Sequence, residues 1–270
     1  MSAIPLEDNF TDILGKAQRG LKLEDEALAE RAGVSPADLR RVKGGAVEER
    51  IILKVAEALG LSGKSLANSA KKAWSPQPQS IDGLAQFNTA YEDMTVNAYM
   101  VWDPKTREAA VFDTGADSSG MVRFAQEQKL AINLILLTHT HPDHIADLAQ
   151  LMKKTSARAF VCESESIPGA QTFSEGKIFK VGNLTIETRQ TSGHSRGGIT
   201  YVISGLARRV AIVGDSMFAG SMGGGSVSYA DALNNNRKKI LTLEDETILC
   251  PGHGPLTTVG EEKLHNPFFP

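Results

Sequence analysis

The chain has 270 residues, of which 41% are hydrophobic and 23% charged, an ordinary globular composition for one large domain or two of unequal size. Its net charge of -3 excludes a general electrostatic attraction to nucleic acid or membrane, and no apolar run approaches the ~20 residues of a membrane span. The first ten residues lack the basic and apolar regions of a secretory signal and the two cysteines lie far apart, so we expect a cytoplasmic protein with buried, reduced thiols.

Residues 10–73 carry apolar side chains at helical spacing throughout. Ser35 is a good N-cap and Pro36 suits the first helical position, so the pair marks a helix start just after Gly33 has ended the preceding helix. The predicted helices after residue 20 cover 23–32, 36–42, 51–59 and 66–74.

One pair of these helices has a recognisable sequence. The segment 23–43, with Ala29-Glu30-Arg31-Ala32-Gly33-Val34-Ser35 at its centre, resembles the helix-turn-helix of phage-repressor-like (XRE-type) DNA-binding domains. The resemblance implies that the second helix enters the major groove, where Arg40, Arg41 and Lys43 meet bases or phosphates. Residues 1–74 contain 12 Lys/Arg and 11 Asp/Glu, a net charge of only +1. A protein-protein or homodimerisation module is therefore an equal alternative to DNA binding.

The stretch Ser75-Pro76-Gln77-Pro78-Gln79-Ser80 separates two parts of the chain. Its alternating prolines prevent a helix and stiffen an extended path. The sequence therefore predicts a small all-α domain over 1–74, a linker over 75–80 and a second domain over 81–270.

From residue 84 the chain alternates strands with a few helices. Asp113, Asp215 and His253 each follow the end of a predicted strand, so the chain places polar side chains repeatedly at strand ends. The predicted strands are 96–102, 109–112, 132–137, 157–162, 177–181, 184–188, 199–203, 209–213 and 247–250, and the predicted helices are 120–129 and 230–241.

The stretch Thr138-His139-Thr140-His141-Pro142-Asp143-His144 holds three of the six histidines. It follows an apolar strand and precedes a helical pattern, the position where open α/β sheets place ligands. His139 and His141 are two apart and project to one side of an extended chain, and Asp143 and His144 follow at the turn. These nitrogen and oxygen atoms suit two adjacent metal ions better than one. His194 and His253, each beside glycine, are further candidate ligands.

The histidine stretch, followed in order by His194, Asp215 and His253, resembles the metallo-β-lactamase fold superfamily. The flanks of these three residues are similar to the glyoxalase II-like branch: Thr191-Ser192-Gly193-His194-Ser195-Arg196-Gly197-Gly198, Gly214-Asp215-Ser216-Met217-Phe218-Ala219-Gly220 and Pro251-Gly252-His253-Gly254-Pro255. The resemblance covers residues 80–270. It implies an α/β fold, an αββα sandwich of two mixed sheets with helices outside and metals at one edge.

The resemblance also implies a role for each ligand residue. One divalent metal ion belongs to His139, His141 and His194, and a second to Asp143, His144 and His253, with Asp215 bridging. Ligands of this type suit Zn²⁺ best and also accept Fe²⁺ or Mn²⁺. A metal-bridged hydroxide held by Asp143 and Asp215 is the expected nucleophile. Asp113 is expected to accept a hydrogen bond from a ligand histidine or to be structural.

The expected activity is hydrolysis of a small-molecule thioester or ester. The C-terminal helical region that binds glutathione in glyoxalase II has no counterpart before Pro270, which favours a substrate smaller than S-lactoylglutathione. Three alternatives stay open at this point: a mononuclear iron persulfide dioxygenase, a β-lactam or lactone hydrolase, and a DNA-binding regulator that responds to a metabolite. The loop at Gly223-Gly224-Gly225 is expected at the mouth of the site, and His265 is expected to be structural.

Overall fold

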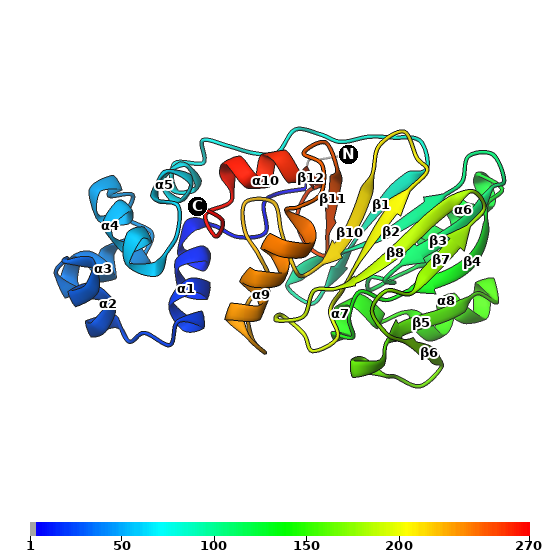
Figure 1. Ribbon diagram of the computed structural model, residues 1–270, viewed down its shortest axis with the longest axis horizontal. Coiled ribbons are helices and arrows are strands. Elements are labelled where there is room, and N and C mark those ends of the chain that lie inside the picture. Colours follow the sequence, from blue (N-terminus) through cyan, green and yellow to red (C-terminus); the bar gives the residue numbers. More distant parts are fainter. Residues whose placement is uncertain (1–3) are drawn as a thin grey trace.

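The computed structural model describes residues 4–270, so the first three residues of the predicted helical domain lie outside it. Two six-stranded sheets lie face to face and a helical region extends from one end (Figure 1). This arrangement is the predicted α/β fold with a helical N-terminal region. No helix in residues 4–270 is both long and apolar enough to cross a membrane.

The first sheet has the strand order β1-β2-β3-β4-β5-β6. Its first three strands pair antiparallel and its last four pair parallel. The strands are β1 (Leu84–Tyr91), β2 (Met94–Trp102), β3 (Glu108–Phe112), β4 (Ala131–Leu136), β5 (Arg158–Cys162) and β6 (Ala170–Phe173). The helices of this half are α6 (Ser119–Glu127), α7 (Pro142–Ile145) and α8 (Leu148–Thr155), with a 3-10 turn η1 (Glu163–Glu165).

The second sheet has the order β12-β11-β10-β9-β8-β7, and only its β10–β11 pair is parallel. Its strands are β7 (Ile178–Val181), β8 (Leu184–Gln190), β9 (Ile199–Ser204), β10 (Val210–Gly214), β11 (Ile248–Pro251) and β12 (Thr257–Thr258). Helix α9 (Tyr229–Asn235), the π-helical turn η2 (Asn236–Ile240) and α10 (Val259–His265) belong to this half.

Alternating side chains of each strand build three apolar layers. In β3, Ala110 and Phe112 face the core between the sheets, whereas Ala109 and Val111 face the outer layer that α6 and α8 cover. Because both faces of these central strands are buried, their sequences are continuously apolar. The outer face of the second sheet, including Ala211 of β10, packs in a third core with the N-terminal helices.

The helical region comprises α1 (Phe10–Gly20), α2 (Asp25–Ala32), α3 (Pro36–Lys43), α4 (Glu49–Leu59) and α5 (Gly63–Ala70). Ser35 caps α3 by accepting a hydrogen bond from the backbone N–H of Asp38, and Gly33 ends α2 at φ 60°, as the sequence predicted. The prediction of a helix over 66–74 was wrong in its limits, because α5 begins at Gly63 and ends at Ala70. Trp74 instead stacks on His265, with ring centroids 4.7 Å apart.

Candidate metal centre

Seven side chains converge at one edge of the sandwich, from the segments that follow β4, β8, β10 and β11. The structure brings together all seven residues that the resemblance implied, in two groups. The first group is His139, His141, His194 and Asp215, and the second is Asp143, His144 and His253. Within each group, one potential ligand atom per residue lies within 4.8 Å of the others. A metal-binding His/Asp cluster is therefore present.

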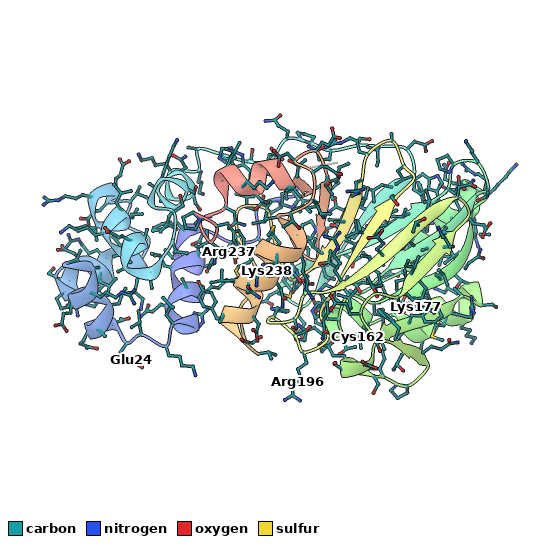
Figure 2. The ribbon with its side chains drawn as sticks, in the orientation of Figure 1. Glu24, Cys162, Lys177, Arg196, Arg237 and Lys238 are labelled. Carbon is teal, nitrogen blue, oxygen red and sulfur yellow. The ribbon has the colours of Figure 1, made fainter. Side chains whose placement is uncertain are left out.

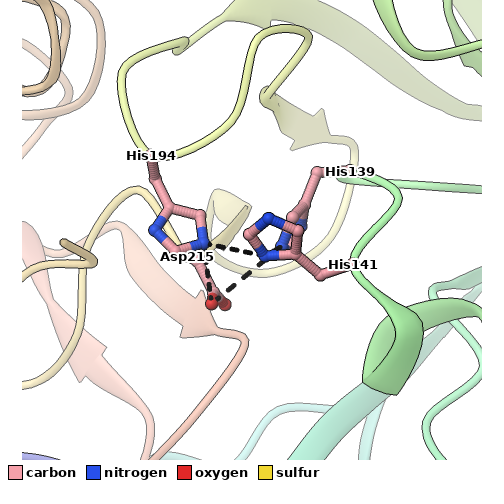
Figure 3. Close-up of side chains that lie close together, drawn as sticks. All are labelled: His139, His141, His194 and Asp215. Carbon is pink, nitrogen blue, oxygen red and sulfur yellow. Dashed lines mark hydrogen bonds and ion pairs between the residues drawn. The ribbon is translucent and has the colours of Figure 1, made fainter. Parts of the chain in front are cut away.

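The first group is compact (Figure 3). His141 Nδ1 lies 3.0 Å from His139 Nε2 and 3.1 Å from His194 Nε2. Asp215 Oδ2 lies 3.4 Å from His194 Nε2 and 4.0 Å from His139 Nε2. Three ring nitrogens and one carboxylate oxygen thus face a common point. Ring nitrogens this close together are better suited to binding one shared cation than to hydrogen bonding with each other.

Asp215 also belongs, by distance, to the second group. Its Oδ1 lies 3.2 Å from His144 Nε2 and its Oδ2 lies 3.5 Å from His253 Nε2. Asp143 Oδ2 completes this group, at 3.4 Å from His144 Nε2 and 3.3 Å from His253 Nε2. The carboxylate of Asp215 therefore lies between the two groups, where a bridging ligand belongs.

Two buried polar atoms of the cluster show whether its residues are suited to metal ions. His144 Nε2 and Asp215 Oδ1 are buried and lie 3.2 Å apart, and neither forms a hydrogen bond with any other described residue. A buried polar atom without a partner destabilises the fold unless something else binds it. Because both atoms point into the cluster, the residues fit divalent cations.

The second nitrogen of most ligand rings is held by the protein. His144 Nδ1 lies 2.8 Å from Asp113 Oδ2, His194 Nδ1 lies 3.0 Å from the Gly224 carbonyl, and His253 Nδ1 lies 2.7 Å from the Thr95 carbonyl. Carbonyl and carboxylate oxygens accept, so each Nδ1 carries a proton, and each Nε2 faces the cluster, where a cation could replace its proton. Asp113 therefore accepts a hydrogen bond from His144, and its expected role beside a metal ligand stays a prediction.

The electrostatic field of the cluster favours cations. Burial lowers the pKa of His139, and the neighbouring His144 lowers it further. Burial also opposes the charged form of His144, but Asp215 and Asp113 raise its pKa to about 10. Burial likewise opposes the charged form of His253, yet Asp143 and Asp215 raise its pKa to about 11. The carboxylates thus hold positive charge here, which a metal ion supplies when it displaces the protons.

The two ligand carboxylates stay ionised at neutral pH. Burial acts to raise the pKa of Asp215, but His144 and His253 hold that pKa well below its ordinary value. Burial acts in the same direction on Asp143, and a hydrogen bond from His253 and the charge of His144 lower its pKa. Ionised, buried carboxylates suit metal ligands and are poor proton donors.

Glu165, which lies just after β5, was not among the predicted site residues. Its carboxylate accepts hydrogen bonds from the backbone N–H of Thr140 at 2.8 Å and of Gly197 at 2.7 Å. Glu165 therefore ties the His139–His141 loop to the loop that carries His194. Its only sequence signal is an acidic residue after a strand, which is too common to single it out. Arg196, in the second loop, is exposed and points away from the cluster (Figure 2).

The predicted DNA-contacting residues lie on α3, at the far end of the molecule from the metal centre (Figure 1). Arg41 pairs with Asp38 and Glu48, and Lys43 pairs with Asp25. Arg40 is exposed on the same helix. Carboxylates thus neutralise two of the three cations, and DNA binding by this region stays a prediction.

The αββα sandwich and its edge cluster of histidines and aspartates define a metal-dependent enzyme fold. The chain belongs to the metallo-β-lactamase superfamily, since the model of that family matches residues 91–253. The match begins in β1, so helices α1–α5 lie outside it.

Known proteins of this superfamily resemble the chain over the same part. The hydroxyacylglutathione hydrolase GloC of Haemophilus influenzae is 29% identical over 198 residues, which cover 64% of this chain and 92% of that protein. The B3 metallo-β-lactamase BLEG-1 is 27% identical with a TM-score of 0.61, covering 69% of this chain and 99% of that one. TTHA1623, solved in a di-iron-bound form, is 25% identical with a TM-score of 0.56, covering 67% and 99%.

Proposed function

We propose that the protein is a dinuclear metallohydrolase that cleaves a thioester or ester. The observation that carries the proposal is the position of Asp215 between two complete ligand groups, with its Oδ1 and His144 Nε2 buried and otherwise unpartnered. Two adjacent cations, when bound, polarise a carbonyl and make water nucleophilic at neutral pH. The similarity to a hydroxyacylglutathione hydrolase favours a thioester among acyl substrates.

The chain's own residues have supporting tasks in this reaction. His139, His141 and His194 would hold one cation, Asp143, His144 and His253 would hold the second, and the Asp215 carboxylate would contribute to both. Hydrolysis forms a carbon–oxygen bond to the acyl carbon, breaks its carbon–sulfur bond and leaves a carboxylate, a thiol and a proton. The acyl carbon needs no nucleophilic side chain, and Cys162 and Cys250 are buried away from solvent.

The proposal predicts that ligand substitutions remove metal and hydrolysis together. We expect His139→Ala and Asp215→Asn each to lower both the bound metal and thiol release by at least ~100-fold, because each variant removes a ligand from a buried cluster. Metal content by elemental analysis and thiol release in a colorimetric assay measure the two losses. Asp117→Asn, an exposed aspartate outside the cluster, is the control. Full turnover in a metal-replete His139→Ala protein would refute the assigned ligand role.

The same preparations distinguish the competing activities. A panel of acyl thioesters, esters, lactones and β-lactams on metal-analysed protein separates the hydrolase classes. One iron per chain with oxygen uptake on a glutathione persulfide would replace the hydrolase by a dioxygenase. The presence of two ligand groups favours the dinuclear hydrolase, and the di-iron relative makes iron as well as zinc a metal to test.

A further inference from the structure

A cleft of about 750 Å³ lies between helix α1 and the loop that precedes α9. One wall carries three basic side chains, Lys16, Arg19 and Lys22, and the other wall is the segment 224–230. No acidic residue lines this cleft among the described residues. Helix α1 lies beside α9 in Figure 1. The cleft is therefore positively charged on a chain whose net charge is negative.

The two walls are held together at Tyr229, which is buried. A Cβ on Gly20 of α1 would lie 2.3 Å from the Tyr229 ring, and a Cβ on Gly225 would lie 2.4 Å from the Tyr229 Cα. Only glycine allows both approaches. The cleft is thus a packed junction of the helical region with the catalytic sandwich rather than a gap between loosely attached parts.

The loop wall of the cleft is also part of the metal centre. The Gly224 carbonyl accepts the hydrogen bond from His194 Nδ1, and Ser226 Oγ donates to the His194 carbonyl at 2.7 Å. A group bound in the cleft therefore lies against the same loop that orients a ligand histidine.

The α1 side of the cleft is linked through Phe218 to His253 of the second group. Lys16 pairs with Asp8, donates to the Met222 carbonyl at 2.9 Å and lies 4.9 Å from the centre of the Phe218 ring. The Phe218 ring meets His253 edge to face at 5.6 Å. Lys16 is neutralised, whereas no carboxylate in residues 4–270 forms a salt bridge with Arg19 or Lys22. Two uncompensated cations thus remain at the cleft.

We propose that this cleft binds the anionic thiol portion of a thioester substrate, with Arg19 and Lys22 as specificity-determining residues. The inference rests on the proposed thioester hydrolysis. The cleft has the size of a small-molecule site, and exposed guanidinium and ammonium groups recognise carboxylate or phosphate. The helical region thereby forms part of the substrate site, in addition to any role of α3.

The test compares three thioesters with one acyl group: acetyl-glutathione, which carries carboxylates, acetyl-coenzyme A, which carries phosphates, and acetyl-N-acetylcysteamine, which is neutral. In the double variant Arg19→Gln/Lys22→Gln, we expect the KM of the preferred anionic thioester to rise about tenfold or more, with kcat and the neutral thioester unchanged. Added salt should raise the same KM in the wild type. The control Arg31→Gln/Arg50→Gln removes two exposed charges elsewhere in the helical region.

An equal effect on all three thioesters, or an unchanged KM for the anionic pair, would overturn the proposal. If the wild type hydrolyses no thioester, the thioester part of the proposed function fails, and calorimetric titration with free glutathione and coenzyme A then tests the cleft alone. An anion site is supported if the double variant loses the binding of glutathione or coenzyme A and the control variant keeps it. If neither glutathione nor coenzyme A binds, or if the wild type, the double variant and the control bind them equally, the proposed anion site is rejected.

Discussion

Asp113 shows how a single side chain sets the state of the metal centre. Its Oδ2 faces both His144 Nδ1 at 2.8 Å and Thr138 Oγ1 at 2.7 Å, while its Oδ1 accepts from the Thr138 backbone N–H. Because Thr138 Oγ1 donates to Asp113, it accepts from His139 Nδ1, 3.0 Å away. One carboxylate therefore fixes the tautomers of a histidine in each ligand group.

Asp113→Asn is expected to lower metal affinity about 10–100-fold, because the amide keeps the shape and removes the charge that holds the His144 tautomer. Competition titration with a metal chelator measures the change. The control is Asp103→Asn, another buried aspartate with several hydrogen bonds, which lies at the β2–β3 turn and contacts Asn183. Equal affinity in the wild type and the Asp113 variant would show that this carboxylate only supports the fold.

The close approach at Gly252 gives a second residue-scale prediction. A Cβ there would lie 2.1 Å from Asp215 Oδ1 and 2.6 Å from His144 Cε1. Gly252→Ala must therefore displace the ligand cluster, and we expect metal content to fall severalfold while far-ultraviolet circular dichroism stays unchanged. Gly120→Ala, where a Cβ meets nothing within 4 Å, is the matched control. Normal metal content in Gly252→Ala would mean that the cluster adapts.

Residue patterns identified the seven side chains that the fold brings together, but not the groups that hold them in place. The seven share a chemistry that spacing reveals, and Asp113 follows a strand in a recognisable way, whereas their role as metal ligands stays a prediction. The Gly224 and Thr95 carbonyls are backbone groups, and the Glu165 carboxylate binds the backbone N–H groups of Thr140 and Gly197. Any residue supplies a backbone group, so no side-chain pattern marks these positions before the fold is known.

At the scale of elements, apolar periodicity predicted the buried strands but not the edge strands of the first sheet. Strands β1 and β6 were not predicted, because their side chains are mostly half-buried or exposed and their sequences therefore carry weak strand patterns. The predicted helix over 230–241 is an α-helix followed by the π-helical turn η2. Such a change of winding leaves the apolar spacing nearly intact and is hard to predict.

Helix α10 is tied to the segment that follows Asp215 by one buried carboxylate. Glu262 accepts hydrogen bonds from the Gly220 backbone N–H at 3.0 Å, Thr257 Oγ1 at 2.8 Å and Asn266 Nδ2 at 2.7 Å. Burial nevertheless raises the pKa of Glu262 from 4.5 to about 8, against these donors. The folded chain therefore keeps a proton on this carboxyl over a pH range in which the unfolded chain has lost it.

This pKa shift predicts a pH dependence of stability. Below pH 4.5 both states hold the proton, and above about pH 8 neither does. Between these values, rising pH favours the unfolded state by about 1.4 kcal/mol per pH unit from this group. The free energy of unfolding of the wild type should therefore fall relative to Glu262→Gln as pH rises from 5 to 8.

Urea unfolding at several pH values measures this difference. Glu261→Gln makes the same substitution at the neighbouring, half-buried position of α10 and serves as the control. A difference between wild type and Glu262→Gln that does not vary with pH would contradict the shifted pKa.

At the scale of the whole molecule, the helical region and the sandwich share one apolar core. Ile13 and Leu14 of α1 belong to the same buried cluster as Tyr229, Phe268 and Phe269. The Ser62 backbone N–H donates to the Pro267 carbonyl at 2.7 Å, and Trp74 stacks on His265. The proline-rich segment 75–80 predicts a domain boundary, and that boundary stays a prediction. The composition of a linker does not reveal which surfaces the flanking regions bury against each other, so the shared core could not be predicted from the sequence.

A shared core predicts that the two regions unfold together. Removing the N-terminal helices would expose the apolar face of the sandwich that they cover, so neither region should have a stable intermediate of its own. Circular dichroism at 222 nm, dominated by helices, and tryptophan fluorescence, from Trp102 in β2 and Trp74 at the junction, should give coincident transitions. Added Zn²⁺ should raise both midpoints equally, because a ligand of the folded state stabilises the whole cooperative unit. Helices that melt first, at a midpoint insensitive to Zn²⁺, would show that the two regions are independent and that α1 is free to leave the cleft.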